Sequence, residues 1–138
     1  MLTFNYLPIS TLPAPYDIVW SRFPDHHSIG EPGPKPRPAI VLNASTHDDG
    51  TGEVQLIYGT TNLKMHERRQ DFFVANNADM DACGLYRATR FDLDQIAWIP
   101  WAEEWFSAVR DYSSPIIGSL TGHKVKLLQT ALAYKAMR

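Results

Sequence analysis

Residues 17–43 read Asp-Ile-Val-Trp-Ser-Arg-Phe-Pro-Asp-His-His-Ser-Ile-Gly-Glu-Pro-Gly-Pro-Lys-Pro-Arg-Pro-Ala-Ile-Val-Leu-Asn. Apolar β-formers at both ends of this stretch predict two strands, at about residues 16–23 and 37–44. Between them, residues 24–36 are rich in Pro and Gly, and proline cannot donate a hydrogen bond to a ladder from inside a sheet. Polar, titratable groups held between two firm strands are a usual place for a site. We therefore expect the functional site at this loop.

Length and composition set limits on what the chain can be. With 138 residues it is long enough for one domain with a real core. Its net charge of −2 argues against a strongly basic protein that coats nucleic acid without sequence preference. The single cysteine, Cys83, excludes an internal disulfide and a cysteine-based metal site. No apolar run approaches the ~18–20 residues of a membrane span, and the N-terminus does not resemble a signal peptide. We therefore expect a cytoplasmic protein without membrane contact.

The rest of the chain predicts short strands and one closing helix. Asp49-Gly50 indicates a hairpin turn, and the strand at residues 53–60 alternates so that Tyr58 and Thr60 face the same way. Further strands are expected at residues 71–75, 87–93, 95–100 and 115–120, with a helical turn at 78–83 and either a short helix or an insertion at 101–112. The last element reads as a helix capped by Thr121, with an apolar face made by Val125, Leu128, Leu132 and Ala136.

This pattern predicts a mainly β fold, a small, partly open antiparallel barrel with a C-terminal α-helix. Residues 16–138 form the single barrel domain. Residues 1–15 contain three prolines and are expected to form an extended arm without a helix, either packed or frayed.

A family resemblance follows from the same residues. Residues 17–23, Glu31 and residues 37–43 resemble the MazF/PemK (Kid-like) family of toxin endoribonucleases from bacterial toxin–antitoxin pairs, and weaker matches run through residues 60–61 and 94–98. The resemblance covers most of the chain from residue 16 onward. It implies an SH3-like barrel of the CcdB/PemK kind, a homodimer, single-stranded RNA as substrate, and a cognate antitoxin whose disordered acidic tail blocks the site. It implies no metal and no cofactor.

Cleaving RNA without a metal needs a base for the 2′-OH proton, a cation for the phosphorane charge, and an acid for the leaving 5′-oxygen. Arg37 is the expected cation, because its guanidinium stays charged and can fork onto two phosphate oxygens between two stiffening prolines. The resemblance places the family's key arginine here. The alternative is a surface arginine paired with Glu31 or Asp94.

Four more residues are candidates for the chemistry. Thr60 could bind the phosphate or orient the 2′-OH, and we expect it to share a pocket with Arg37. Glu31 could act as the base or orient it. His26 and His27 are natural proton carriers near neutral pH, and we favour His27 because it lies nearer Gly30. Adjacent histidines seldom chelate one ion well, so we do not expect them to hold a metal.

Asp94 matches the family's Asp-Gln pair, whose aspartate helps catalysis in some relatives. Some relatives carry an arginine two residues earlier, where this chain has Asp92; Arg90 could stand in for it. Further RNA contacts are expected from Thr61 and from a basic cluster that could instead be a solvated loop: Lys64, His66, Arg68 and Arg69. The aromatic residues Trp98, Trp101, Trp105 and Phe106 could stack on bases but are more typical of a core or a dimer interface.

Two function classes therefore stay open beside the nuclease. The barrel could have lost catalysis and act as a binding module for an antitoxin, a nucleic acid or gyrase, as the Asp92 departure favours. A third alternative is a housekeeping SH3-like barrel that binds a peptide.

Overall fold

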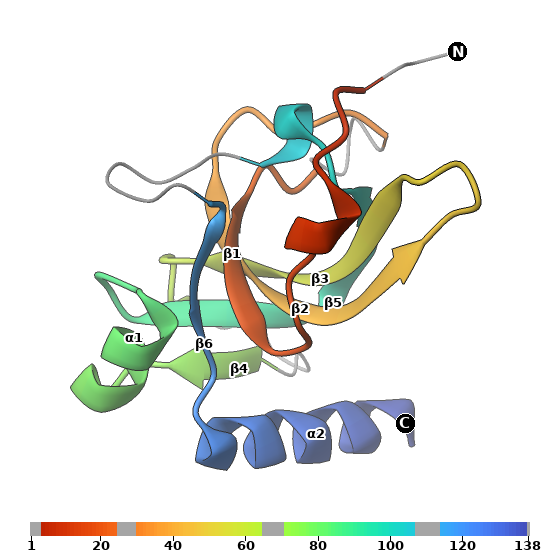
Figure 1. Cartoon of the computed structure of the whole chain (residues 1–138). Helices are drawn as coiled ribbons and strands as arrows, with labels where there is room; N and C mark the ends of the chain where they lie inside the picture. Colours follow the sequence, from red (N-terminus) through yellow and green to blue (C-terminus); the bar gives the residue numbers. More distant parts are fainter. Residues whose placement is uncertain (1–3, 25–29, 65–70, 107–113, 138) are drawn as a thin grey trace.

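The computed structural model describes residues 4–24, 30–64, 71–106 and 114–137. Figure 1 shows the arrangement of the elements in these ranges. The strands are β1 (Asp17–Ser21), β2 (Arg37–Thr46), β3 (Gly52–Thr60), β4 (Asp71–Val74), β5 (Thr89–Pro100) and β6 (Ile116–Ser119). The helices are α1 (Asn77–Cys83) and α2 (Gly122–Ala136), and two short 3₁₀ turns occur at η1 (Ile9–Thr11) and η2 (Glu103–Trp105).

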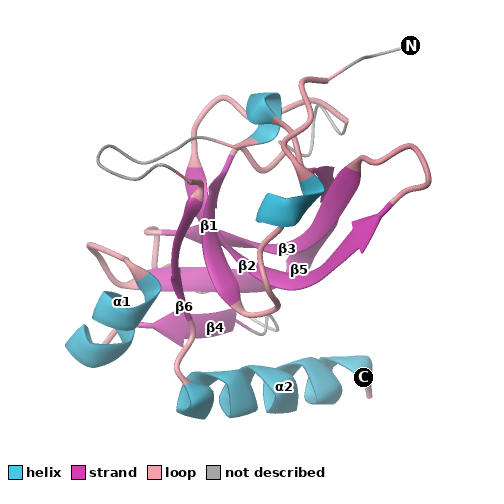
Figure 2. Cartoon of the chain, in the orientation of Figure 1, coloured by secondary structure: helices cyan, strands magenta, loops and turns pink. Residues whose placement is uncertain are grey.

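The six strands form one antiparallel sheet in the order β4-β5-β3-β2-β1-β6. The sheet is not closed by a ladder between its edge strands, but α1 follows β4 in the chain and packs against β6 (Figures 1 and 2). The approach is close, because a Cβ atom at Gly84 would lie 2.1 Å from the carbonyl oxygen of Ile117. A mainly β fold with a C-terminal helix is thus confirmed, and its open sheet is consistent with a partly open barrel.

Both faces of the sheet are buried, which explains the continuous apolar runs in β1 and β2. Ile18 belongs to a core that α2 covers through Leu128, and the next residue, Val19, belongs to a second core on the other face. The second core contains Trp101 and Trp105, so these two tryptophans are core residues, whereas Trp98 is 45% exposed.

The N-terminal arm packs on this second core. The Leu7 N–H donates to the carbonyl oxygen of Trp101, and Trp101 Nε1 donates to Thr11 Oγ1 at 3.0 Å. Figure 1 shows the arm and η2 on the side of the sheet away from α2. The arm is mostly extended, but the prediction that it holds no helix was wrong at η1, where one 3₁₀ turn packs beside the sheet.

Residues 87–100 were predicted to form two strands, and this was wrong. Residues 89–100 form the single long strand β5, whose ladder with β3 passes from the Ile57–Ile96 pair to the Gly59–Phe91 pair. The residues between form a bulge opposite Tyr58. The Asp92 carboxylate accepts hydrogen bonds from the Asp94 N–H and Gln95 Nε2, both at 2.9 Å, so these polar groups have partners within the one strand.

Residue boundaries of the other elements follow local chemistry. β1 ends at Ser21, two residues earlier than predicted, because the Arg22 N–H leaves the ladder and donates to the Trp105 carbonyl. α2 begins after Thr121, whose side chain accepts a hydrogen bond from the Lys124 N–H as predicted. In the described ranges, no helix has the length and apolar character that crossing a membrane requires.

Candidate functional site

A cavity of about 460 Å³ surrounds Arg37, at the point where the Pro/Gly loop enters β2. Its lining consists of Phe23, Pro24, Pro34, Lys35, Arg37, Tyr58 and Gln95. These residues come from five places: the segment after β1, the loop exit, the start of β2, the last part of β3 and the bulge of β5. Among the described residues, the lining contains two cationic side chains and no carboxylate, a composition that suits an anion.

Strand register brings Arg37 and Tyr58 together. Ala39 pairs with Tyr58 across the β2–β3 ladder, and side chains two residues apart on a strand share a face, so Arg37 lies on the same face as Tyr58. The guanidinium carbon lies 5.9 Å from the centroid of the Tyr58 ring, which itself packs at 5.3 Å from the ring of Phe23. Tyr58 thus gives the Arg37 guanidinium a cation–π contact that is open to the cavity.

Arg37 has no carboxylate partner among the described residues. The alternative that it is a structural arginine paired with Glu31 or Asp94 therefore finds no support. Asp94 forms an ion pair with Lys135 at 3.7 Å, and Glu31 is exposed and does not line the cavity. The half-buried guanidinium is consequently able to bind an added anion.

The loop exit is pinned against β1, which fixes the cavity wall. The Gly33 N–H donates to the Arg22 carbonyl at 3.0 Å. A Cβ atom at position 33 would lie 2.2 Å from the carbonyl oxygen of Phe23, so the backbone approaches more closely than a side chain would permit. This contact places Pro34 and Lys35 beside the start of β2.

Thr60 does not line the Arg37 cavity. Its side chain is only 5% exposed, and its hydroxyl accepts a hydrogen bond from the Asn62 N–H at 3.1 Å. The expectation that Arg37 and Thr60 share one pocket is not met within the single chain. Thr61, its neighbour, is exposed and lines a different cavity.

Arg90 is part of a buried ion pair. It is 6% exposed, donates from Nε to the Asn62 carbonyl at 2.9 Å, and pairs with Asp71 at 3.4 Å, where the Asp71 side chain is fully buried. These contacts hold β4 and the end of β3 together. They leave Arg90 turned to the protein rather than toward a substrate.

Asp92 positions Gln95 at the cavity. Asp92 is 1% exposed, and its carboxylate accepts from Gln95 Nε2, so the amide group that lines the Arg37 cavity is held by the bulge of β5. The Asp-Gln motif thus reaches the cavity through Gln95, while Asp94 is an exposed residue beside α2.

Several predicted residues cannot be placed. His26, His27, His66, Arg68 and Arg69 lie outside the described residues. Lys64 is exposed in the segment after β3. In residues 4–24, 30–64, 71–106 and 114–137, no group of three or more His, Cys, Asp and Glu side chains is placed to hold a metal ion.

Three cavity residues were missed as site candidates: Lys35, Tyr58 and Gln95. The sequence did carry a signal for Tyr58. The predicted alternation in β3 placed Tyr58 on the same face as Thr60, which was itself a predicted site residue. The contact between β2 and Tyr58 depends on the register of the ladder, which no local pattern reveals.

Neither a scan against models of known protein families nor a search of curated proteins found a match to this chain. The assignment of a function therefore depends on the sequence motifs and on the geometry of the Arg37 cavity.

Proposed function

We propose that the protein is a metal-independent endoribonuclease of the MazF/PemK type, the toxin of a toxin–antitoxin pair, with its scissile phosphate bound at Arg37. The observation that carries the proposal is the half-buried Arg37 guanidinium, which lies over the Tyr58 ring in a cavity whose described lining also contains Lys35 and holds no carboxylate. An SH3-like barrel, a homodimer and an antitoxin that occupies the same cavity belong to this proposal.

The reaction is an internal transesterification. The ribose 2′-oxygen attacks phosphorus, the bond from phosphorus to the 5′-oxygen breaks, and the products are a 2′,3′-cyclic phosphate and a free 5′-hydroxyl. Arg37 contributes two parallel donors to the non-bridging oxygens as charge increases on them, and Lys35 adds a second positive charge at the same cavity.

The proton carriers are assigned to the Pro/Gly loop that precedes Arg37. Glu31 and His27 are the proposed base and acid, since both belong to the loop whose exit is pinned beside the cavity. Because Thr60 does not line the cavity, Tyr58, whose ring contacts the Arg37 guanidinium and whose side chain carries a hydroxyl, is the proposed donor to the phosphate.

The test is cleavage of a long single-stranded RNA in EDTA. We expect discrete fragments with 2′,3′-cyclic phosphate ends from the wild type. Arg37→Ala should lower the rate by about 10²–10³, the usual effect of removing one preorganised donor to a developing oxyanion. Arg37→Lys should cleave at a rate between those of the wild type and Arg37→Ala, because lysine keeps the positive charge but lacks the two parallel donors of the guanidinium.

Lys126→Ala is the matched control, since Lys126 is an exposed cation on α2 that does not line the Arg37 cavity. It should cleave at the wild-type rate. An intact RNA after incubation with the wild type, or equal rates for wild type and Arg37→Ala, would show that the nuclease assignment is wrong.

A second candidate function has one observation in its favour. Because Thr60 is turned away from the cavity, this chain could bind RNA or an acidic antitoxin tail at Arg37 without cutting. Retained RNA binding that Arg37→Ala abolishes, together with no cleavage, would favour such a binding module.

A further inference from the structure

A second cavity, of about 320 Å³, is lined by Pro38, the residue that follows Arg37 in β2. Its lining consists of Trp20, Pro38, Thr61, Gly84, Leu85, Tyr86, Arg87, Thr89 and Ile117. Arg37 and Pro38 are consecutive residues of a strand, so their side chains point to opposite faces and each reaches a different cavity. The two cavities therefore share the same strand end.

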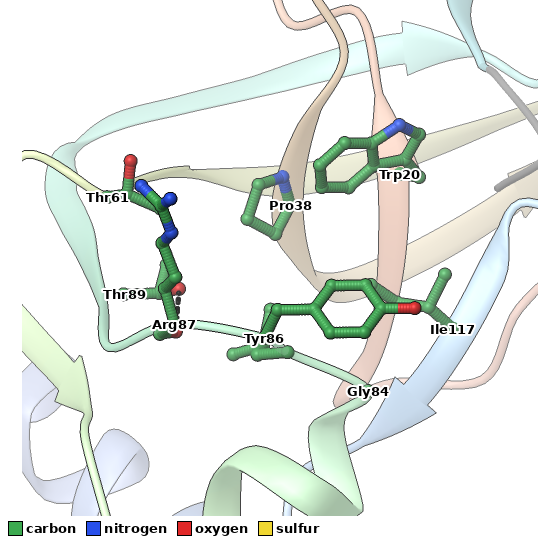
Figure 3. Close-up of a pocket in the computed structure, with 9 residues that line it drawn as sticks. Trp20, Pro38, Thr61, Gly84, Tyr86, Arg87, Thr89 and Ile117 are labelled. Carbon is green, nitrogen blue, oxygen red and sulfur yellow. Dashed lines mark hydrogen bonds between the residues drawn. The ribbon is translucent and has the colours of Figure 1, made fainter.

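Figure 3 shows that this second cavity has an apolar part and a polar end. The Trp20 ring lies beside Pro38, and the Tyr86 ring lies across from these two residues. The side chains of Thr61 and Arg87 lie together at the other end. A flat apolar ligand with polar groups along one edge matches this division.

The cavity wall is built from fixed backbone. Trp20 and Pro38 are paired across the β1–β2 ladder. Gly84 adopts the left-handed conformation at φ 71° and lies against Ile117, which sets the direction of the segment that carries Tyr86. The Thr89 hydroxyl donates to the Arg87 carbonyl at 3.0 Å, as the dashed line in Figure 3 marks.

Tyr86 has an environment that packing does not explain. Its side chain is 86% exposed although it forms part of a cavity lined mostly by apolar groups. A large aromatic ring held at a rim with a free face is the arrangement that proteins use to stack bases of single-stranded nucleic acid.

We propose that this cavity binds a nucleobase of the RNA whose phosphate lies at Arg37, with the base stacked on Tyr86 and its polar edge facing Thr61 and Arg87. The proposal rests on the proposed function for its substrate. In the part of the chain that the structure describes, the two cavities are lined by the cations Lys35, Arg37 and Arg87 and by no carboxylate, which favours a polyanion over an apolar or basic peptide.

The test uses binding, so it does not require cleavage. Heptanucleotides of adenine, cytosine or uracil with 2′-fluoro groups cannot react through a 2′-OH, and their affinity can be measured by quenching of tryptophan fluorescence. Tyr86→Ala should weaken the best heptamer by about 10-fold, within the range for loss of one stacked base, while Tyr86→Phe should bind like wild type. Circular dichroism should show the same fold for all three proteins.

A heptamer series with one abasic position identifies the base. One abasic position should weaken binding to the wild type by about 10-fold and should have little further effect on Tyr86→Ala, because the same contact is already lost. Equal affinities of wild type and Tyr86→Ala for every heptamer, or no measurable binding to the wild type, would overturn the base-binding proposal.

These outcomes separate the two proposals. RNA cleavage that depends on Arg37 with no effect of Tyr86 on binding would overturn the base site and leave the nuclease intact. Base binding at Tyr86 without any cleavage would support the base site and overturn the nuclease proposal. A Tyr86→Ala protein with unchanged heptamer affinity but an altered sedimentation mass would assign the cavity to contact with a second copy, and this too would overturn the proposal.

Discussion

Replacing Leu128 with alanine should test how α2 is seated on the sheet. Leu128 is the one residue of α2 whose side chain is fully buried, and it packs in the core that contains Ile18, Ile40 and Phe91. Leu→Ala substitutions in cores cost about 2–5 kcal/mol, since they lose transfer free energy and leave a cavity. We expect a loss of about 3 kcal/mol in the free energy of unfolding, because α2 covers the core from one side only.

The adjacent leucine supplies the control. Leu127 is 44% exposed, so Leu127→Ala should change the free energy of unfolding by no more than about 0.5 kcal/mol. Urea unfolding followed by circular dichroism measures both variants. With an m-value of about 2 kcal/mol/M, Leu128→Ala should lower the midpoint by about 1.5 M and leave the slope unchanged. In a thermal scan the same loss corresponds to about 10 °C in Tm.

The comparison between these two variants tests which face of α2 contacts the sheet. A larger effect of Leu127→Ala than of Leu128→Ala would mean that α2 is rotated about its axis, so that a different face contacts the sheet. Equal and small effects would mean that α2 does not pack on the core at all.

Two further predictions concern buried groups. Burial, with a smaller contribution from Asp79, raises the pKa of Cys83 from about 9 to about 11; native Cys83 should therefore react with iodoacetamide at pH 8 at least about 100-fold more slowly than in the urea-unfolded chain. Because the folded pKa is raised, the stability that Cys83 contributes is constant below about pH 9 and is lost between about pH 9 and 11; the difference in unfolding free energy between wild type and Cys83→Ala should follow that course, and a flat difference would contradict it. Gly33→Ala should destabilise the fold by about 1–3 kcal/mol in the same urea assay, since the added Cβ meets the Phe23 carbonyl, whereas an unchanged midpoint would show that the loop exit is free to move.

Much of the fold could be predicted from local signals. Arg37-Pro38 marks the start of β2, Asp49-Gly50 the turn into β3, and Thr121 the N-cap of α2, because each of these depends on the chemistry of a few neighbouring residues. The prediction of separate strands at residues 87–93 and 95–100 was wrong. The gap between them falls in the bulge of β5, where the Asp92 carboxylate accepts hydrogen bonds from the Asp94 N–H and Gln95 Nε2 and the strand continues.

The candidate site was predictable only in part. Proline-flanked Arg37 was found from sequence because its surroundings are local. Its partner Tyr58 and the separation from Thr60 depend on the pairing of β2 with β3 and on the turn after β3, where Asn62 engages the Thr60 hydroxyl. The second cavity joins β1, β2, β6 and the α1–β5 connection, and no spacing within one segment indicates such a set.

The position of β1 in the sheet has a consequence for how the chain acquires its structure during synthesis. β1 pairs with β2 on one side and with β6 on the other, and Asp17 accepts a hydrogen bond from Ser119, 102 residues later. In the arm before β1, Thr11 accepts a hydrogen bond from Trp101, 90 residues later. Contacts so distant in sequence are slow to form, because a long loop must close first. A ribosome-bound chain that has not yet exposed residue 119 can pair its first strand with β2 but not with β6, so one edge of β1 stays without a ladder partner until β6 has been made.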